Sequence, residues 1–119
     1  ADTLVLCDDE VMGKPKDAED ARRMLHRLSA KAHKVITAVS IRNNLRHITF
    51  KDTSYVYFKE LSEEEISYYI NNFKPFDKAG AYGIQEWIGY IGIERIEGSF
   101  FNIMGLPIHA VYKELQNFI

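Results

Sequence analysis

Runs of apolar and β-branched residues predict four strands along the chain. Residues 3–7 form a short, continuous apolar run that ends in acidic residues, which is typical of a buried strand with a solvent-facing exit. Residues 33–42 and 46–58 are rich in valine, isoleucine, threonine, tyrosine and phenylalanine, which favours two long strands. Ile88, Tyr90, Ile91 and Ile93 indicate a fourth strand over residues 88–96.

Two irregular positions are expected in the pair of long strands. Asn43 and Asn44 lie between the strands, and asparagine tolerates the positive φ that a tight hairpin turn requires. The alternation of apolar and polar residues slips near Asp52 and Thr53. An extra residue in one strand produces such a slip, so a β-bulge is predicted there.

Two segments combine a capping residue with the spacing of an amphipathic helix. Residues 17–30 begin at Asp17, which can cap a helix N-terminus. Residues 62–73 begin at Ser62, and Glu65 completes a capping box. The apolar face of the first helix comprises Ala21, Met24, Leu25 and Leu28, and that of the second comprises Ile66, Tyr69, Ile70 and Phe73.

A last helix is predicted after residues 105–107, where glycine ends the preceding element and proline suits a helix start. Its apolar face is expected to comprise Ile108, Val111, Tyr112, Leu115 and Phe118. Residues 74–86 are predicted to form a loop. The resulting order is β-α-β-β-α-β-α, and the two long strands make a hairpin. We therefore predict an α/β fold, with a mixed β-sheet flanked by helices in a single domain at 1–119.

Composition and charge narrow the class of protein. A chain of 119 residues with 46% hydrophobic and 27% charged residues suits one globular domain. The net charge of -2 argues against a nucleic acid polymer as partner, although a few lysines suffice for a nucleotide site. No apolar run approaches the roughly 20 residues needed to span a membrane, and no signal peptide is visible. We expect a cytoplasmic protein with no membrane partner.

The single cysteine and the first residues add two expectations. Cys7 cannot form an internal disulfide, which fits a reducing compartment, and its apolar neighbours predict a buried structural thiol. Ala1, Asp2 and Thr3 run straight into an apolar strand without an initiator methionine. This start is expected of a chain cut from a longer protein.

Asp2 and Lys14 are the first candidates for chemistry. Asp2 lies at the mouth of a predicted strand, where carboxylates of α/β folds often act as bases or bind metal ions. A solvated terminal acid is the alternative. Lys14 lies between Gly13 and Pro15, just before a predicted helix, so a constrained loop presents its ammonium group to phosphate oxygens. An ordinary turn lysine is the alternative, because the segment lacks the longer P-loop pattern.

Residues 77–85, with the sequence DKAGAYGIQ, form the loop with the most candidate residues. Lys78 follows an acidic residue, and two glycines then bracket a tyrosine. Gln85 can donate and accept hydrogen bonds together, as reading the edge of a base requires. A structured loop held by Asp77 and Lys78 is the alternative. The four histidines have no metal-ligand spacing and are expected to be structural or exposed: His26, His33, His47 and His109.

Taken in order, these motifs resemble the Maf family from end to end. They read ADT at residues 1–3, GKP at residues 13–15, HKVITAV at residues 33–39 and DKAGAYGIQ at residues 77–85. Gly98 and the sequence NIMGLP at residues 102–107 close the series. Several ordered motifs at matching spacing are far more specific than any one of them.

The resemblance implies a Maf/ITPase-like domain that cuts nucleoside triphosphates to monophosphate and pyrophosphate with a divalent cation, Mg²⁺ or Mn²⁺. Asp2 matches the proposed general base of the family and is also a candidate metal ligand. Thr3 and Gln85 match positions associated with substrate choice, and resemble the branch that acts on dTTP and UTP or on modified pyrimidine nucleotides. Lys14 and Lys78 match lysines that contact phosphate. The resemblance also suggests a homodimer.

Two departures from the family pattern leave alternatives open. The family's N-terminal strand and its Ser-rich loop with paired arginines are missing, and that loop supplies part of the triphosphate site. Glu86 and Trp87 follow the last motif, where the family usually has a small residue. One alternative is a nucleotide-binding regulator of cell division and septum formation without significant catalysis. Another is an inert piece whose site cannot assemble.

Overall fold

The computed structural model describes residues 1–118 and contains one five-stranded sheet. The strand order is β2-β1-β3-β4-β5, and every pair of neighbours is antiparallel. The strands are β1 (Asp2–Cys7), β2 (Glu10–Met12), β3 (Ala32–Arg42), β4 (His47–Phe58) and β5 (Ile93–Glu97). The helices are α1 (Ala18–Leu28), α2 (Glu63–Phe73), the short 3-10 helix η1 (Ala79–Ala81), α3 (Trp87–Gly92), α4 (Phe100–Met104) and α5 (Ile108–Phe118).

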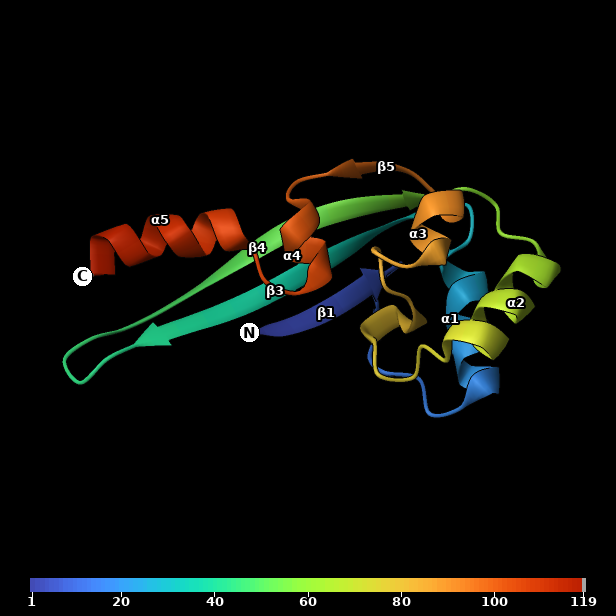
Figure 1. Cartoon of the computed structure of the whole chain (residues 1–119), viewed down its shortest axis with the longest axis horizontal. Helices are drawn as coiled ribbons and strands as arrows, with labels where there is room; N and C mark the ends of the chain where they lie inside the picture. The colour runs from blue at the N-terminus through green and yellow to red at the C-terminus, as the bar shows by residue number, and fades with distance from the viewer. Residues whose placement is uncertain (119) are drawn as a thin grey trace.

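The long hairpin of β3 and β4 runs along the length of the molecule, whose extents are 51 × 27 × 26 Å (Figure 1). Its register is continuous from the Ala32–Tyr57 pair to the Arg42–His47 pair. At one end of the hairpin lie α1, α2 and α3, and at the other end α5 lies beside the strands (Figure 1). The pairing of β1 with β3 extends from the Asp2–Ala38 pair to the Leu6–Lys34 pair. β1 therefore covers only the half of β3 that is nearer the three helices.

The main core lies between the sheet and α1 and α2. Asp17 caps α1 by accepting a hydrogen bond from the Asp20 amide, and Ser62 and Glu65 form the predicted capping box of α2. Each helix turns its predicted apolar face inward, and Leu25 and Ile66 have no exposed surface. Cys7 is buried in the same core, as predicted, and burial raises the pKa of its thiol.

The α/β class is confirmed, but the predicted mixed pairing is wrong. The chain leaves β1 through a turn in which Asp8 and Asp9 have φ of 49° and 66°, and it pairs back at once as β2. α1 then returns the chain so that β3 runs antiparallel to β1. Parallel neighbours require a crossover from one end of the sheet to the other, and no connection in residues 1–118 makes one between paired strands.

The two predicted irregularities of the hairpin are also corrected. Neither Asn43 nor Asn44 has a positive φ, because the turn is closed by a side chain. The Asn43 carboxamide oxygen accepts from the amides of Leu45 and Arg46, both at 2.8 Å. The bulge predicted at residues 52–53 is absent from the β3–β4 register, and the irregularity of β4 lies instead at Tyr57 and Phe58, opposite β5.

The predicted strand at 88–96 is wrong in its first half, which forms α3 before β5 begins. A short apolar run satisfies either period, and packing decides between them. Gly89 lies against the carbonyl of Ile84, where an added Cβ would be 1.8 Å from the oxygen. α4 was not predicted; Ser99 caps its N-terminus, and Gly105, with φ 114°, ends it.

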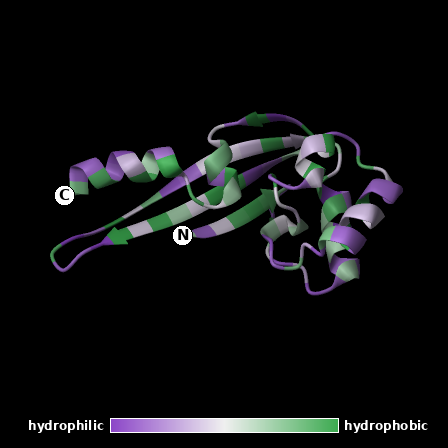
Figure 2. Cartoon of the chain, in the orientation of Figure 1, coloured by the Kyte–Doolittle hydropathy of each residue, from purple (hydrophilic) through white to green (hydrophobic). Residues whose placement is uncertain are grey.

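α5 forms where it was predicted, but most of its apolar face is not buried. Phe118 is buried, whereas Ile108 is 51% exposed and Tyr112 is 62% exposed. Hydrophobic and hydrophilic residues alternate around this helix (Figure 2). Arg46 anchors its last turn by donating to the carbonyls of Asn117 and Phe118. No helix within the described residues is long and apolar enough to cross a membrane.

Candidate functional site: a cleft beside β1

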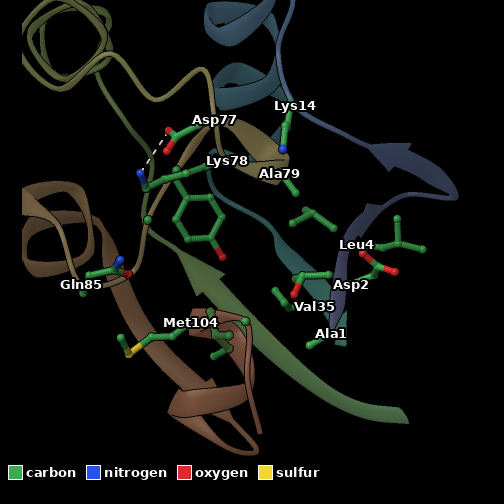
Figure 3. Close-up of a pocket in the computed structure, with 16 residues that line it drawn as sticks. Ala1, Asp2, Leu4, Lys14, Val35, Asp77, Lys78, Ala79, Gln85 and Met104 are labelled. Carbon is green, nitrogen blue, oxygen red and sulfur yellow. Dashed lines mark hydrogen bonds and ion pairs between the residues drawn. The ribbon is translucent and has the colours of Figure 1, made fainter. Parts of the chain in front are cut away.

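A cleft of about 520 Å³ opens between β1, the loop after β2, the 77–85 segment and α4 (Figure 3). Such a volume suits a small-molecule ligand. All five site residues predicted from the sequence line this cleft: Asp2, Thr3, Lys14, Lys78 and Gln85. They come from three segments that are distant in the sequence, and the fold brings these segments together.

The segment that carries Lys14 is held by a close backbone contact. The Gly80 amide donates to the Gly13 carbonyl at 3.1 Å, which joins this loop to η1. Gly80 has φ 72°, and an added Cβ would lie 3.1 Å from the side chain of Val5. Pro15 is buried, whereas Lys14 is exposed at the rim of the cleft. The lysine therefore projects from a constrained support, as the sequence predicted.

Lys78 projects from the other loop and lies among carboxylates. Its Nζ is 3.2 Å from Asp77 Oδ1 and 4.0 Å from Glu86 Oε1. The hydrogen bond from Lys78 lowers the pKa of the Asp77 carboxyl below its usual range, and the charge of Lys14 lowers it further. Both lysines therefore act on the carboxylate of Asp77 and line the same cleft.

A buried tyrosine holds the back of this loop. The Tyr69 hydroxyl donates to Glu86 at 2.5 Å and accepts from the Gly83 amide at 3.1 Å. A side chain at Gly83 would meet Glu86 and Lys78, each at 2.8 Å. Glu86, which departs from the family pattern, is therefore part of the support of Lys78.

Tyr82 forms an inner wall of the cleft and is paired with a buried histidine. Its hydroxyl lies 2.7 Å from His33 Nε2, and His33 stacks on Phe58. Burial lowers the pKa of His33 to about 4, so its imidazole is neutral at physiological pH. The structural role expected of this histidine is confirmed.

Asp2 and Gln85 border the cleft and are both exposed. Within residues 1–118, neither side chain forms an ion pair or a hydrogen bond to another side chain. An exposed carboxylate and an uncommitted carboxamide remain available to a ligand. In Figure 3, Lys14 comes from one segment and Lys78 and Gln85 from another, around the space that Asp2 also borders.

No group of three or more histidine, cysteine or acidic residues that could hold a metal ion is found in residues 1–118. Asp2 and Asp77 nevertheless bring two carboxylates to the cleft. Mg²⁺ is commonly bound through one or two carboxylates together with substrate phosphates and waters. The donor set therefore fits a divalent cation that arrives with a phosphorylated ligand, and Asp2 is the less engaged of the two carboxylates.

The sequence did not reveal which buried residues support the cleft. Thr37 and Asn102 lie behind Thr3, with Thr37 Oγ1 at 2.9 Å from Thr3 Oγ1. Ile103, Met104 and Gly105 line the cleft from α4 and the residue that follows it. The sequence pointed to Thr37 and Asn102 only in that both fall in the motifs that resemble the Maf family.

The fold and the cleft define an α/β protein with a small-molecule site that presents two lysines, a carboxylate and a carboxamide. The family model of Maf-like proteins matches residues 1–118. The chain belongs to the Maf family, in agreement with the motifs in its sequence.

Several relatives resemble this chain over nearly its whole length. It is 53% identical over 118 residues to the dTTP/UTP pyrophosphatase of Porphyromonas gingivalis (strain ATCC 33277), a match of 99% of this chain and 59% of the relative. The dTTP/UTP pyrophosphatase of Parabacteroides distasonis is 54% identical, over 99% of this chain and 61% of the relative. The dTTP/UTP pyrophosphatase of Christiangramia forsetii is 51% identical, over 100% of this chain and 61% of the relative. The chain thus spans about three-fifths of the length of these relatives.

Proposed function

We propose that this chain provides most of the active site of a nucleoside triphosphate pyrophosphatase that hydrolyses dTTP, UTP or modified pyrimidine nucleotides. The observation that carries the proposal is the convergence of Asp2, Lys14, Lys78 and Gln85 on one cleft. The three relatives described above are all named dTTP/UTP pyrophosphatases, which supports the choice of substrate.

In the proposed reaction, water attacks the α-phosphorus, the bond from this atom to the bridging oxygen breaks, and pyrophosphate leaves. Asp2 accepts the proton of the attacking water. Lys14 and Lys78 stabilise the negative charge that grows on the phosphate oxygens. Asp2 is also the residue that would hold a divalent cation, Mg²⁺ or Mn²⁺, which would neutralise charge on the phosphates.

Thr3 and Gln85 contact the base in this proposal. Gln85 is exposed at the opening, and its carboxamide offers a donor and an acceptor to a pyrimidine edge. We infer that further phosphate contacts come from the part of the relatives that this chain does not cover. Full activity is therefore expected of a chain extended to the length of the relatives.

The test is release of pyrophosphate from a panel of nucleoside triphosphates with Mg²⁺ or Mn²⁺, on this chain and on the extended chain. In H₂¹⁸O, attack at the α-phosphorus places the label in the nucleoside monophosphate, whereas attack at the β-phosphorus places it in pyrophosphate. Label in the monophosphate from dTTP and UTP supports the proposal. No pyrophosphate from any nucleotide would refute it and favour a nucleotide-binding regulator.

Asp2→Asn tests the role of the carboxylate. We expect turnover to fall by about a hundredfold or more, because general-base catalysis typically contributes about 10²–10⁴-fold. The circular dichroism spectrum should not change, since Asp2 is exposed. Asp9→Asn is the matched control in the turn at the other end of β1, and should retain the full rate. An Asp2→Asn enzyme as fast as the unmodified protein would remove Asp2 from the mechanism.

A further inference from the structure

A line of hydrogen-bonding groups leads from the cleft into the core. Thr3 Oγ1 lies 2.9 Å from Thr37 Oγ1, and Thr37 Oγ1 lies 3.1 Å from the carbonyl oxygen of Asn102. Thr3 on β1 and Thr37 on β3 are opposite each other in the sheet register. Thr3 is half-buried and lines the cleft, whereas Thr37 and Asn102 have no exposed surface.

Asn102 is held in place from several directions. Its Nδ2 donates to the Val35 carbonyl at 3.2 Å and to Ser54 Oγ at 2.9 Å. The Gly105 amide donates to the backbone carbonyl of Asn102 at 3.0 Å. The acceptor that faces Thr37 is therefore part of a fixed support that joins α4 to β3 and β4.

The direction of each hydrogen bond follows from a count of protons. A threonine hydroxyl has one proton and two lone pairs, and a carbonyl oxygen can only accept. Thr37 must therefore donate to Asn102, which leaves no proton for Thr3, and so Thr3 donates to Thr37. The reverse direction would form one hydrogen bond in place of two and leave the buried pair less satisfied.

We propose that Thr37 is a positioning residue that holds the Thr3 hydroxyl as a hydrogen-bond acceptor toward the cleft, so that Thr3 selects ligand groups that donate an N–H. The inference rests on the proposed function, because it assumes that a pyrimidine base meets Thr3. Uracil and thymine carry an imide N–H at ring position 3. Cytosine carries a lone pair at that position, which faces the lone pairs of Thr3.

Gln85 cannot make this distinction alone. Its exposed carboxamide can rotate to offer either a donor or an acceptor to the same edge. The proton of Thr3 is committed to Thr37 and has no such freedom. Thr37, which does not touch the ligand, therefore decides that Thr3 acts as an acceptor in the cleft.

The experiment compares kcat/KM for UTP and CTP in the extended chain and three variants. Thr37→Val keeps the shape and the strand propensity but removes the hydroxyl, and the Asn102 carbonyl keeps its bond from the Gly105 amide. Thr37→Ser keeps the hydroxyl. Thr49→Val is the matched control, since Thr49 lies on β4 in an exposed hydroxyl pair with Ser40 at 3.2 Å.

We expect Thr37→Val to lower the ratio of UTP to CTP by about tenfold, because the freed Thr3 proton can then turn to the cytosine lone pair. Thr37→Ser should restore the original ratio, and Thr49→Val should not change it. A merely structural role would lower both rates together and leave the ratio unchanged. An unchanged ratio in Thr37→Val, with UTP still cleaved by the unmodified protein, overturns the inference and leaves the proposed function standing.

A second measurement needs neither nucleotide nor variant. The exchange of threonine hydroxyl protons can be followed by deuterium isotope shifts of the Cβ resonances in mixed H₂O and D₂O. Slow exchange at Thr3 supports the assigned direction, because its proton is then bound to Thr37, and fast exchange at Thr3 overturns it. If no pyrimidine triphosphate is cleaved, the proposed function fails, and this exchange rate still decides whether Thr37 fixes the Thr3 proton.

Discussion

The two ends of the β3–β4 hairpin differ in how completely they bury apolar side chains. At the end near the cleft, Leu25, Ile66 and Ile88 on three different helices have no exposed surface. At the other end, α5 is equally regular but leaves Ile108 and Tyr112 more than half exposed. An amphipathic pattern therefore predicts which face of a helix is apolar, and it does not predict whether a partner covers that face.

The cleft lies between these ends, where β1 begins beside the middle of β3. Its polar residues have supports drawn from the well-packed end: Tyr69 from α2 holds Glu86, and His33 from β3 holds Tyr82. Rigid packing behind a site reduces the reorganisation needed when a ligand binds. Within residues 1–118, the end of the hairpin beside α5 provides no such support to any of the five predicted site residues.

Truncation in the core should separate the two ends most strongly. Leu25→Ala removes a buried side chain from α1 and should lower the free energy of unfolding by about 2–5 kcal/mol. Ile108→Ala on α5 should change it by less than about 0.5 kcal/mol, because the side chain is half exposed. Urea denaturation of both variants measures the difference. Equal losses would mean that α5 is as well packed as α1.

His33 on β3 should make the free energy of unfolding depend on pH. Burial holds the pKa of His33 at about 4, below its ordinary value of about 6.5. The unfolded chain binds more protons between these values, so stability rises with pH across that window and is lost as the pH falls through it. The loss from His33 amounts to about 3 kcal/mol between pH 7 and pH 4.

Denaturation over this pH range tests the histidine comparison. His33→Gln should flatten the dependence between pH 4 and 6.5. His47→Gln, at the exposed turn end of the hairpin, is the matched control for a histidine substitution. A steep dependence that survives in His33→Gln would assign it to another group.

Removal of a cleft lysine should affect catalysis and leave stability almost unchanged. Lys78→Ala should lower kcat/KM for UTP by about a hundredfold, because a preorganised positive charge is lost from the phosphate site. Lys113→Ala on α5 removes an equally common surface charge far from the cleft and should keep the full rate. Steady-state kinetics on the extended chain provides the measurement. Equal rates in the two variants would contradict the assignment of Lys78.

The smallest effect is expected at the turn between β3 and β4. Asn43→Ala removes two hydrogen bonds to the amides of Leu45 and Arg46 and should lower the free energy of unfolding by about 1 kcal/mol. Asn44→Ala, with no such side-chain bonds within residues 1–118, should cost less. Both should retain activity, since neither residue lines the cleft. Thermal denaturation would compare them.

Much of the fold was predictable because its signals are local. The caps of α1 and α2, the long hairpin and the helix after Pro107 each depend on residues within a few positions of one another. The segment at 88–96 was not predictable, since its short apolar run suits both a helix and a strand. The contact of Gly89 with the Ile84 carbonyl decided that it begins as α3.

The same division holds for the candidate site. Lys14, Lys78 and Gln85 could be chosen from their motifs, because glycine, proline and polar residues mark loops that present side chains. Their roles remain proposals. Thr37 and Asn102 could not be chosen, because a buried threonine on a strand and an asparagine near a turn look ordinary until their partners are known.

Local periodicity, capping and motif spacing were enough to predict the α/β class, most of the elements and five of the residues that line the cleft. Tertiary structure decided the antiparallel order of the strands, the burial of each apolar face and the proton direction at Thr3. These properties depend on contacts between residues far apart in the chain, such as Thr3, Thr37 and Asn102. Only folding brings such groups within hydrogen-bonding distance.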